Sequence, residues 1–408
     1  MNNPVGIAGY GVISPLGNDL RAFDEALFNG RSAVGPMPLA LPGQDLTHVP
    51  AARCTFEESE VRAASNLPLD RGTAMAIGAA DSAMAAAGLT PGGVDPERLG
   101  VYWGSGMGGA TTFEATCRAL YAEQRRIRPT TIVSTMPNAP VAELALRWQA
   151  RGAALAYACA CASAAVAIGE ALIAIRAGRI DVAIAGGSES LLSPGVVGAW
   201  QAMRVLAALG NAAPARVCRP FAADRSGFAL GEGAAALVLE SDAHARARGA
   251  VPTVGVAGYA TNCDGKHITQ PDPSGQARAM AAALRDAGLG ADDIRHVNAH
   301  GTATSFGDAA EAESIARVFG GSRPAVTATK AVIGHLLGAG GAVEFVATLR
   351  ALECGLVPPT AHVVQADPAF TIDLVVGEAR RVPGLRHALS NSFAFGGTNA
   401  VLVASRLD

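Results

Sequence analysis

Residues 157–171 read YACACASAAVAIGEA, and this stretch indicates how the chain folds around it. The segment leading into it, ALAYACA, is apolar and β-prone, whereas the residues after Cys161 are the small residues of a buried helix. A strand that passes into a helix is the repeating unit of a parallel sheet covered by helices. The stretch therefore predicts an α/β protein and places Cys161 where the strand ends and the helix begins.

The same alternation continues on both sides of this stretch. The strand LGVYWGSG precedes an expected helix at 111–126, and IDVAIAGG precedes one at about 196–209. The strands are apolar throughout, which indicates helices on both faces of the sheet. After residue 250 the alternation resumes, with expected helices at 275–288, 307–319 and 339–353. We therefore expect two α/β halves, residues 1–250 and residues 251–408.

Composition excludes several classes of protein. Of the 408 residues, 50% are apolar and 16% are charged, which suits a compact enzyme. The 32 basic and 35 acidic side chains give a net charge of −3 without a basic run, so nucleic acid is not an expected partner. Residues 153–169 carry no charge but are too weakly hydrophobic to predict a membrane span.

Cysteine usage and the N-terminus indicate the compartment. Seven cysteines without framework spacing favour a reducing environment, since the odd count leaves at least one unpaired within the chain. The opening MNNPVGIAGYGVISPLG lacks a basic segment followed by a long apolar one, so no export signal is expected. A cytoplasmic protein is expected.

Two glycine-containing motifs match known functional motifs only in part. GSGMGG at 104–109 matches the spacing of a dinucleotide fingerprint, but no acidic residue closes a second strand about twenty residues later. GGSES at 186–190 lacks the closing glycine of a serine-hydrolase elbow. The first motif is better interpreted as a tight structural turn, and the second gives only weak support for a serine hydrolase.

Cys159 and Cys161 have several possible roles. No second Cys or His pair with metal-ligand spacing accompanies them, so metal is not expected, and a disulfide between residues two apart would be strained. Structural thiols or a nucleophile remain. At a helix start, backbone N–H groups could stabilise a thiolate by up to ~2 kcal/mol, which would bring the pKa of Cys161 from ~8.5 to near 7.

Two histidines share an unusual context in the second half. His300 ends a strand before a glycine turn, and His335 follows a glycine in an apolar loop. A lone buried histidine is usually a hydrogen-bonded core residue. Two of them, with Lys330 five residues before His335 and Glu344 fourteen after Lys330, predict a site.

The segment NSFAFGGTN at 391–399 is a glycine turn between two strands and carries Phe393 and Phe395. Such a turn can direct a backbone N–H at an oxyanion, while its aromatic side chains form an apolar gate.

Taken together, these stretches resemble the elongating β-ketoacyl-acyl carrier protein synthases of the thiolase superfamily. The resemblance implies a thiolase-like α/β fold with two similar halves layered αβαβα. The stretches that carry it are VGIAGYGVISPLGN, GSGMGG, YACACASAAVAIGEA, AGGSES, RPFAADRSGFALGEGAAALVLE, NAHGTATSFGDAAE, TKAVIGHLLGAGGAVE and NSFAFGGTNA.

The resemblance selects the nucleophile. In the family the nucleophilic cysteine stands seven residues before the Ile of IGEA, which selects Cys161 and leaves Cys159 as a structural thiol. Two departures are visible: CACASA lacks the Thr or Ser that often follows the nucleophile, and TSFGD replaces a more usual Thr-Pro-x-Gly-Asp. Both could reshape the acyl or pantetheine tunnel.

The resemblance also implies a mechanism. Cys161 would take an acyl group from a carrier protein's phosphopantetheine arm, and a malonyl group on a second carrier would then lose carbon dioxide and attack the thioester. Neutral His300 and His335 would donate hydrogen bonds to the enolate. Lys330 would orient the His335 region and pair with Glu344.

Further residues follow from the same resemblance. The N–H groups of Cys161 and Phe395 would hold the thioester oxyanion, and Phe395, supported by Phe393, would act as the gate. Thr302 and Thr304 match positions that touch pantetheine, although such a hydroxyl is as often capping its own backbone.

The implied partner is an acidic acyl carrier protein, with no cofactor and no metal. Arg125, Arg126 and Arg204 are the implied docking residues; Arg128 is a candidate by charge alone, and a solvated loop is the alternative for each. A homodimer is expected, with a heterodimer containing a homologous subunit as the alternative.

Related functions remain to be weighed. A degradative thiolase carries its nucleophile earlier and has a C-terminal Cys-x-Gly turn, where this chain has FGGTN. The non-catalytic subunit of polyketide heterodimers lacks the nucleophile, but this chain could be the active half of such a pair. Acyl chain length and the choice between fatty-acid and polyketide pathways stay open.

Overall fold

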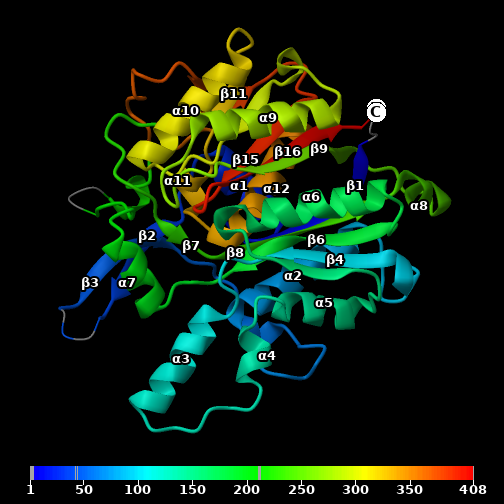
Figure 1. The fold of residues 1–408 in the computed structure, drawn as a ribbon, viewed down its shortest axis with the longest axis vertical. Helices are drawn as coiled ribbons and strands as arrows, with labels where there is room; N and C mark the ends of the chain where they lie inside the picture. Colours follow the sequence, from blue (N-terminus) through cyan, green and yellow to red (C-terminus); the bar gives the residue numbers. More distant parts are fainter. Residues whose placement is uncertain (1–3, 42, 44, 210–212, 408) are drawn as a thin grey trace.

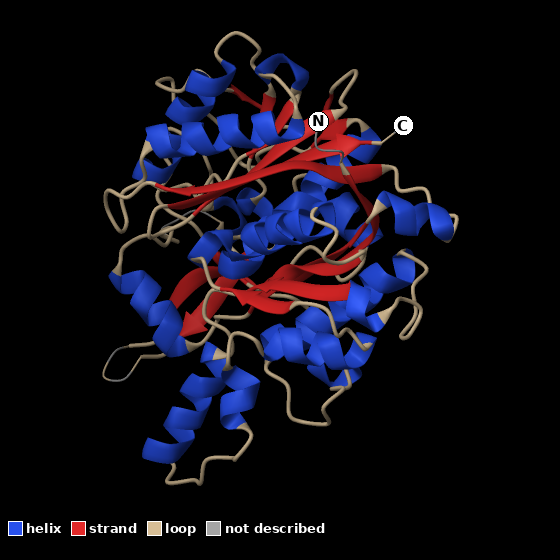
Figure 2. Cartoon of the chain, turned by 45° about the vertical axis from the view of Figure 1, so that its right-hand side comes forward, coloured by secondary structure: helices blue, strands red, loops and turns tan. Residues whose placement is uncertain are grey.

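The computed structural model describes residues 4–41, 43, 45–209 and 213–407. Within them, eleven strands follow one another in the order β13-β11-β10-β15-β16-β9-β1-β8-β6-β4-β5 (Figure 1). The strands β1 and β9 pair only through Val5 with Val256 and Gly6 with Gly255. Beyond this short contact the strands separate into two layers with helices between them (Figure 2).

The two layers repeat one topology. Apart from the two-residue edge strand β13, which pairs with β11, each sheet has the order 3-2-4-5-1 when its strands are numbered along the chain, and its fifth strand, β8 or β16, runs antiparallel to both neighbours. The other pairs, β4 with β5 and β6, and β10 with β11 and β15, are parallel. The prediction of two similar α/β halves is confirmed. The strands are β1 (Val5–Ile13), β4 (Leu99–Gly104), β5 (Ala154–Tyr157), β6 (Val182–Glu189) and β8 (Gly233–Glu240), then β9 (Val254–Cys263), β10 (His296–Asn298), β11 (Ala325–Thr327), β15 (His387–Phe393) and β16 (Thr398–Arg406).

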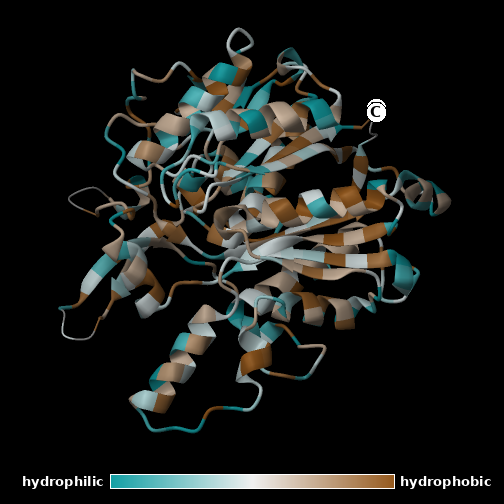
Figure 3. Cartoon of the chain, viewed as in Figure 1, coloured by the Kyte–Doolittle hydropathy of each residue, from teal (hydrophilic) through white to brown (hydrophobic). Residues whose placement is uncertain are grey.

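Helices form the other three layers, which gives the expected αβαβα order. Between the sheets, α6 (Ser163–Arg176) packs against α12 (Gly340–Cys354). The first sheet is covered on its outer face by α2 (Arg71–Ala86) and α5 (Ala139–Trp148), and the second by α9 (Pro273–Ala287) and α10 (Ser305–Phe319). Figure 3 shows α6, which lies between the sheets, as mostly hydrophobic, whereas the outer helices α9 and α10 carry more hydrophilic residues.

Smaller elements surround the end of the sheets where the site lies. The strands β2, β3 and β7 form a separate sheet, and α3, α4 and α7 project from the first half (Figure 1). The remaining helices and strands of the chain are α1 (Leu20–Phe28), β2 (Val34–Leu39), β3 (Thr47–Ala52), α3 (Ala110–Tyr121), α4 (Thr131–Thr135), α7 (Pro194–Ala202), β7 (Leu230–Gly231), α8 (Asp242–Ala247), α11 (Lys330–Ile333), β12 (Leu356–Val357), β13 (Asp373–Leu374) and β14 (Arg380–Arg381).

Two expected helices are shorter than predicted. The helix expected at 111–126 ends at Tyr121, because Gln124 has a φ of +53° and the arginines that follow would repel one another on a helix. The helix expected at about 196–209 ends at Ala202, because Arg204 has a φ of +56°. Arg125, Arg126 and Arg204 therefore lie on turns.

The halves are joined by close packing at Gly169 of α6. A Cβ atom at this position would lie 2.3 Å from ring carbons of Tyr259 on β9. We expect Gly169→Ala to destabilise the protein by about 1–3 kcal/mol, since the overpacked interface must shift. Thermal unfolding measures this. Gly35→Ala is the matched control, because a Cβ there meets nothing within 4 Å; equal melting temperatures for the two variants would contradict the prediction.

Candidate active site

Cys161 lies where the strand-to-helix transition was predicted. β5 ends at Tyr157, Ala160 adopts a φ of +47°, and the single turn η3 (Ala160–Ala162) leads directly into α6. The Cys161 side chain is buried, and the backbone amides of Phe395 and of Cys161 itself both lower the pKa of its thiol. The two amides expected to form an oxyanion site therefore both act on this sulfur.

His335 is held beside the sulfur by its own backbone. Its N–H donates to the carbonyl of Ala229 at 2.7 Å, and Gly334 precedes it with a φ of +70°. The Nε2 atom lies 3.1 Å from Cys161 Sγ, while the N–H of Leu337 donates to Nδ1 at 3.3 Å. Because Nδ1 accepts a hydrogen bond, the ring proton sits on Nε2 and faces the sulfur.

His300 is oriented by a buried ion pair. The Lys330 ammonium lies 3.3 Å from His300 Nδ1, donates to the His300 carbonyl at 2.5 Å and donates to Glu344 Oε1 at 2.6 Å. The ring proton of His300 is therefore also on Nε2. The rings of His300 and His335 lie 5.4 Å apart at an angle of 81°.

Both imidazoles are neutral. Burial, followed by the charge of Lys330, lowers the pKa of His300 and of His335 well below its ordinary value. The site thus presents two neutral N–H donors, as the proposed enolate chemistry requires. Lys330 pairs with Glu344 as expected. Its ammonium, however, contacts His300 and not His335. The connection of Lys330 to the His335 region is through the backbone, because the Lys330 carbonyl accepts from the N–H of Gly334 at the end of α11.

The predicted low pKa of Cys161 is wrong for this pocket. Burial is the main reason that the pKa of the thiol is raised to about 12; the charge of Lys330 and the two backbone amides oppose this increase, and the charge of Glu189 adds to it. The sequence could not show this, because the depth of burial depends on segments far away in the chain. The buried Cys161 sulfur is therefore a protonated thiol at neutral pH.

The Cys-His-His cluster also has ligand atoms that a metal ion could use. The sulfur and one nitrogen of each histidine lie within 4.8 Å of one another. A metal-bound histidine, however, donates its other N–H to an acceptor. Here both Nδ1 atoms face donors, Lys330 and the N–H of Leu337, so the arrangement fits hydrogen-bond donation to a substrate better than metal ligation.

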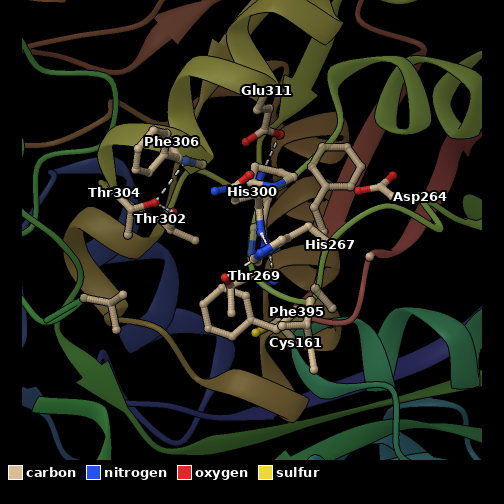
Figure 4. A pocket seen from close by; sticks show the side chains of 18 of the residues that line it. Cys161, Asp264, His267, Thr269, His300, Thr302, Thr304, Phe306, Glu311 and Phe395 are labelled. Atoms are coloured by element: carbon tan, nitrogen blue, oxygen red, sulfur yellow. Dashed lines mark hydrogen bonds between the residues drawn. The ribbon is translucent and has the colours of Figure 1, made fainter. Parts of the chain in front are cut away.

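These groups line a pocket of about 280 Å³ (Figure 4). Thr302 and Thr304 are on its wall, as expected for pantetheine contacts, although Thr304 also accepts from the N–H of Gly307 at 3.2 Å and caps α10. Phe395 lies next to Cys161 and stacks on Trp200, with the two ring centroids 6.0 Å apart. The ring of Phe393 packs edge-on against that of His300, with a centroid distance of 6.2 Å.

Sequence reasoning missed Glu311 and Trp200. The Glu311 carboxylate accepts the N–H groups of His300 and Gly301 at 2.8 and 2.7 Å and so fixes the turn that carries His300. Its position eleven residues after His300, on the buried face of α10, was a usable signal. Trp200 offered none, because its partners Phe228 and Phe395 come from distant segments.

The three docking arginines do not lie together. Arg204 is exposed between Met203 and Val205, which both line the pocket. Arg125 and Arg126 are exposed on the loop after α3, and Arg125 lies 3.2 Å from Glu123. Figure 1 places this loop far from α10, whose residues Phe306 and Gly307 line the pocket, so one chain alone does not bring these arginines to the entrance.

Comparison with known proteins identifies the family. The model "Beta-ketoacyl synthase, N-terminal domain" matches residues 2–245, and "Beta-ketoacyl synthase, C-terminal domain" matches residues 254–364. Nodulation protein E of Rhizobium sp. (strain N33) is 39% identical over 406 residues, which cover 98% of this chain and 99% of that protein. 3-Oxoacyl-acyl-carrier-protein synthase 2 of Staphylococcus aureus (strain N315) is 35% identical over 413 residues, covering 100% and 99%.

Solved ketosynthase structures share the fold of this chain. The solved structure titled "The ishigamide ketosynthase/chain length factor" superimposes with a TM-score of 0.90 and 30% identity over 100% of both chains. Among the described residues, no helix is long and apolar enough to cross a membrane. Because the two family matches together span most of the chain, and the relatives align over nearly all of it, the chain belongs to the β-ketoacyl synthase family of acyl-transferring, carbon–carbon bond-forming enzymes.

Proposed function

We propose that Cys161 takes an acyl group from a carrier protein and that this acyl group is then condensed with malonyl-acyl carrier protein. The observation that carries the proposal is the position of Cys161 Sγ, 3.1 Å from His335 Nε2, with the neutral ring of His300 beside it in the same pocket. In the first step the sulfur attacks the acyl thioester, and the thiol proton leaves with the carrier's pantetheine sulfur.

The second step uses the two imidazoles. The malonyl group loses carbon dioxide, and negative charge collects on its thioester oxygen as an enolate. Nε2–H of His300 and Nε2–H of His335 donate to this oxygen. The enolate carbon attacks the acyl-Cys161 carbonyl, the C–S bond breaks, and the Cys161 sulfur takes up one proton from solvent. The product is a β-ketoacyl thioester on the carrier.

The tetrahedral intermediates on Cys161 also need donors. The N–H groups of Cys161 and Phe395, which both act on the sulfur, would bind the oxyanion, and each donor of this kind contributes roughly 3 kcal/mol. The Phe395 side chain, stacked on Trp200, would act as the gate, with Phe393 holding the His300 ring from the side.

Lys330 and Glu344 would support the site electrostatically. The ammonium holds the His300 tautomer and lowers the pKa of the Cys161 thiol, while Glu344 neutralises this buried charge. Thr302 and Thr304 would contact the pantetheine arm, since both line the pocket. The chemistry is completed by side chains and backbone amides, so we propose no cofactor and no metal.

The carrier protein would dock around the pocket entrance. Met203, Ile268 and Phe306 line the pocket and are exposed, with 45%, 73% and 76% of their surface accessible, so they form an apolar rim. Arg204 beside this rim supplies the positive charge that an acidic carrier requires. Phe306 belongs to TSFGD, the segment that departs from the usual family pattern.

We propose a homodimer in the cytoplasm. β5 is an edge strand with largely exposed residues, and an open strand edge is a template for pairing with a second chain. The ketosynthase/chain length factor structure favours one alternative, in which this chain is the active half of a heterodimer. Co-purification of a homologous second subunit would distinguish the two. The family assignment leaves no support for a degradative thiolase.

Acyl loading provides the direct test. Cys161→Ala should abolish both the mass increase after incubation with acyl-acyl carrier protein and the condensation, because the attacking sulfur is gone. Intact-protein mass spectrometry measures the loading. Cys159→Ala, two residues away and only partly buried, is the control and should load normally. Full condensation by Cys161→Ala would refute the mechanism.

The charge of Lys330 can be tested through the thiol. Lys330→Met should raise the pKa of Cys161, because Glu344, left unpaired, takes up a proton and the nearby positive charge disappears. Alkylation of Cys161 by iodoacetamide at pH 8, followed by peptide mass spectrometry, should slow about tenfold for each unit of increase. Lys266, the only other lysine, is exposed, and Lys266→Met should leave the rate unchanged. Equal rates for both variants would contradict the prediction.

The docking arginines can be ranked by kinetics. Arg204→Glu should raise the KM for the carrier substrate by about three- to tenfold with little change in kcat, because it adds repulsion at the entrance. The double charge reversal at Arg125 and Arg126 should raise KM only if a partner subunit brings that loop to the entrance. An unchanged KM for Arg204→Glu would remove it from the docking surface.

A further inference from the structure

Glu189 is a buried carboxylate that the mechanism above does not use. It is the last residue of β6, and only 1% of its surface is accessible. Four donors reach it: Ser105 Oγ at 3.1 Å, the N–H of Gly106 at 2.5 Å, the N–H of Met107 at 3.4 Å and the N–H of Gly338 at 3.1 Å. They come from two segments more than two hundred residues apart in the chain.

The first segment leads to the nucleophile. Ser105, Gly106 and Met107 form the loop after β4, and the end of β4 lies directly on the start of α6: a Cβ atom at Gly104 would be 2.3 Å from the backbone nitrogen of Ala164. This loop therefore sets the position of the helix start that carries Cys161.

The second segment leads to the histidine. Gly338 lies in the turn η6 (Leu337–Ala339), and the amide immediately before it, Leu337 N–H, is the donor to His335 Nδ1. The carboxylate thus fixes the turn that keeps the ring proton on Nε2. Space is tight, because a Cβ atom at Gly338 would lie 2.4 Å from Glu189 Oε2 and 2.3 Å from the Gly106 nitrogen.

We propose that Glu189 is a positioning residue for the condensation: by binding both segments at once, it sets the tautomer of His335 and the distance of its ring from Cys161. The inference rests on the proposed function of these two residues. A generic packing role is a weaker explanation, because the donors come from two particular segments: the loop after β4, which packs on the start of α6, and the turn η6, which follows His335 and contains its orienting amide.

The charge of Glu189 makes the role testable. Burial raises the pKa of Glu189 to about 7, against the effect of its hydrogen bonds, so the carboxylate is ionised in weakly alkaline solution. Its negative charge raises the pKa of the Cys161 thiol. Removing the charge should therefore make the thiol easier to ionise while loosening the geometry that condensation needs. A packing defect would impair both.

The decisive variant is Glu189→Gln at pH 8.5. The neutral amide weakens all of these hydrogen bonds, because a charged acceptor binds about twice as strongly, and its nitrogen must face either the N–H of Met107 or those of Gly106 and Gly338, so the hold on the two segments loosens. We expect kcat for condensation to fall at least about tenfold, the KM for the carrier substrate to stay within about twofold, and alkylation of Cys161 by iodoacetamide to be as fast as in the wild type or faster.

The matched control is Glu143→Gln. Glu143 is a buried carboxylate on α5, in the outer layer, and it accepts the N–H groups of Ala64 and Ser65 at 2.8 and 3.3 Å. This variant should keep both kcat and the alkylation rate. A loss of kcat in Glu189→Gln no larger than in Glu143→Gln would overturn the proposal, as would a parallel loss of alkylation and condensation.

Ser105→Ala provides a milder second variant if Glu189→Gln does not fold. It removes one donor to Glu189, and kcat should fall severalfold with alkylation retained; an unchanged kcat would overturn the proposal. Absence of condensation by the wild type would count against the proposed function instead, while the ratio of alkylation rates between Glu189→Gln and the wild type still tests Glu189.

Discussion

The site depends on the close approach of backbone to backbone where the two halves meet. Where η6 and the start of α12 meet the first half, glycine leaves no room for larger side chains: a Cβ at Gly341 would lie 2.8 Å from the nitrogen of Ala165, and one at Gly338 would lie 2.3 Å from the nitrogen of Gly106. Only this packing lets a cysteine from the first half and a histidine from the second come within 3.1 Å. The small residues of 157–171 are therefore a functional requirement as well as a folding signal.

Electrostatics then decide how the assembled groups can react. The buried Lys330–Glu344 pair is expensive to desolvate and is a poor source of stability. Its value lies in what the ammonium does locally: it donates to one imidazole, keeps both imidazoles neutral and opposes the desolvation of the thiol. Glu189 acts on the thiol in the opposite direction, so the reactivity of Cys161 is a balance between one buried cation and one buried anion.

The sequence reveals the reacting groups better than the groups that hold them. Cys161, His300 and His335 could be predicted because each stands at an abrupt change of pattern, from apolar strand to small-residue helix or glycine turn. Glu189 could not, since three of its four donors are backbone amides of segments distant in the chain, which no side-chain pattern records. The pKa of Cys161 was mispredicted for the same reason: the helix start is local, but burial is a property of the assembled halves.

The duplication of one α/β unit explains why the turns η3 and η6 can form one site. In each half a single 3-10 turn leads into the central helix: η3 follows the third strand β5 and leads into α6, and η6 follows the third strand β11 and the short helix α11 and leads into α12. Each turn begins at a residue with left-handed backbone, Ala160 at +47° and Leu337 at +48°, which leaves Cys161 and Gly338 at equivalent positions. One half uses the position for a nucleophile. The other leaves it without a side chain, so that a carboxylate from the first half can bind its amide and hold the adjoining histidine, and the two copies of one turn have become complementary parts of a single site.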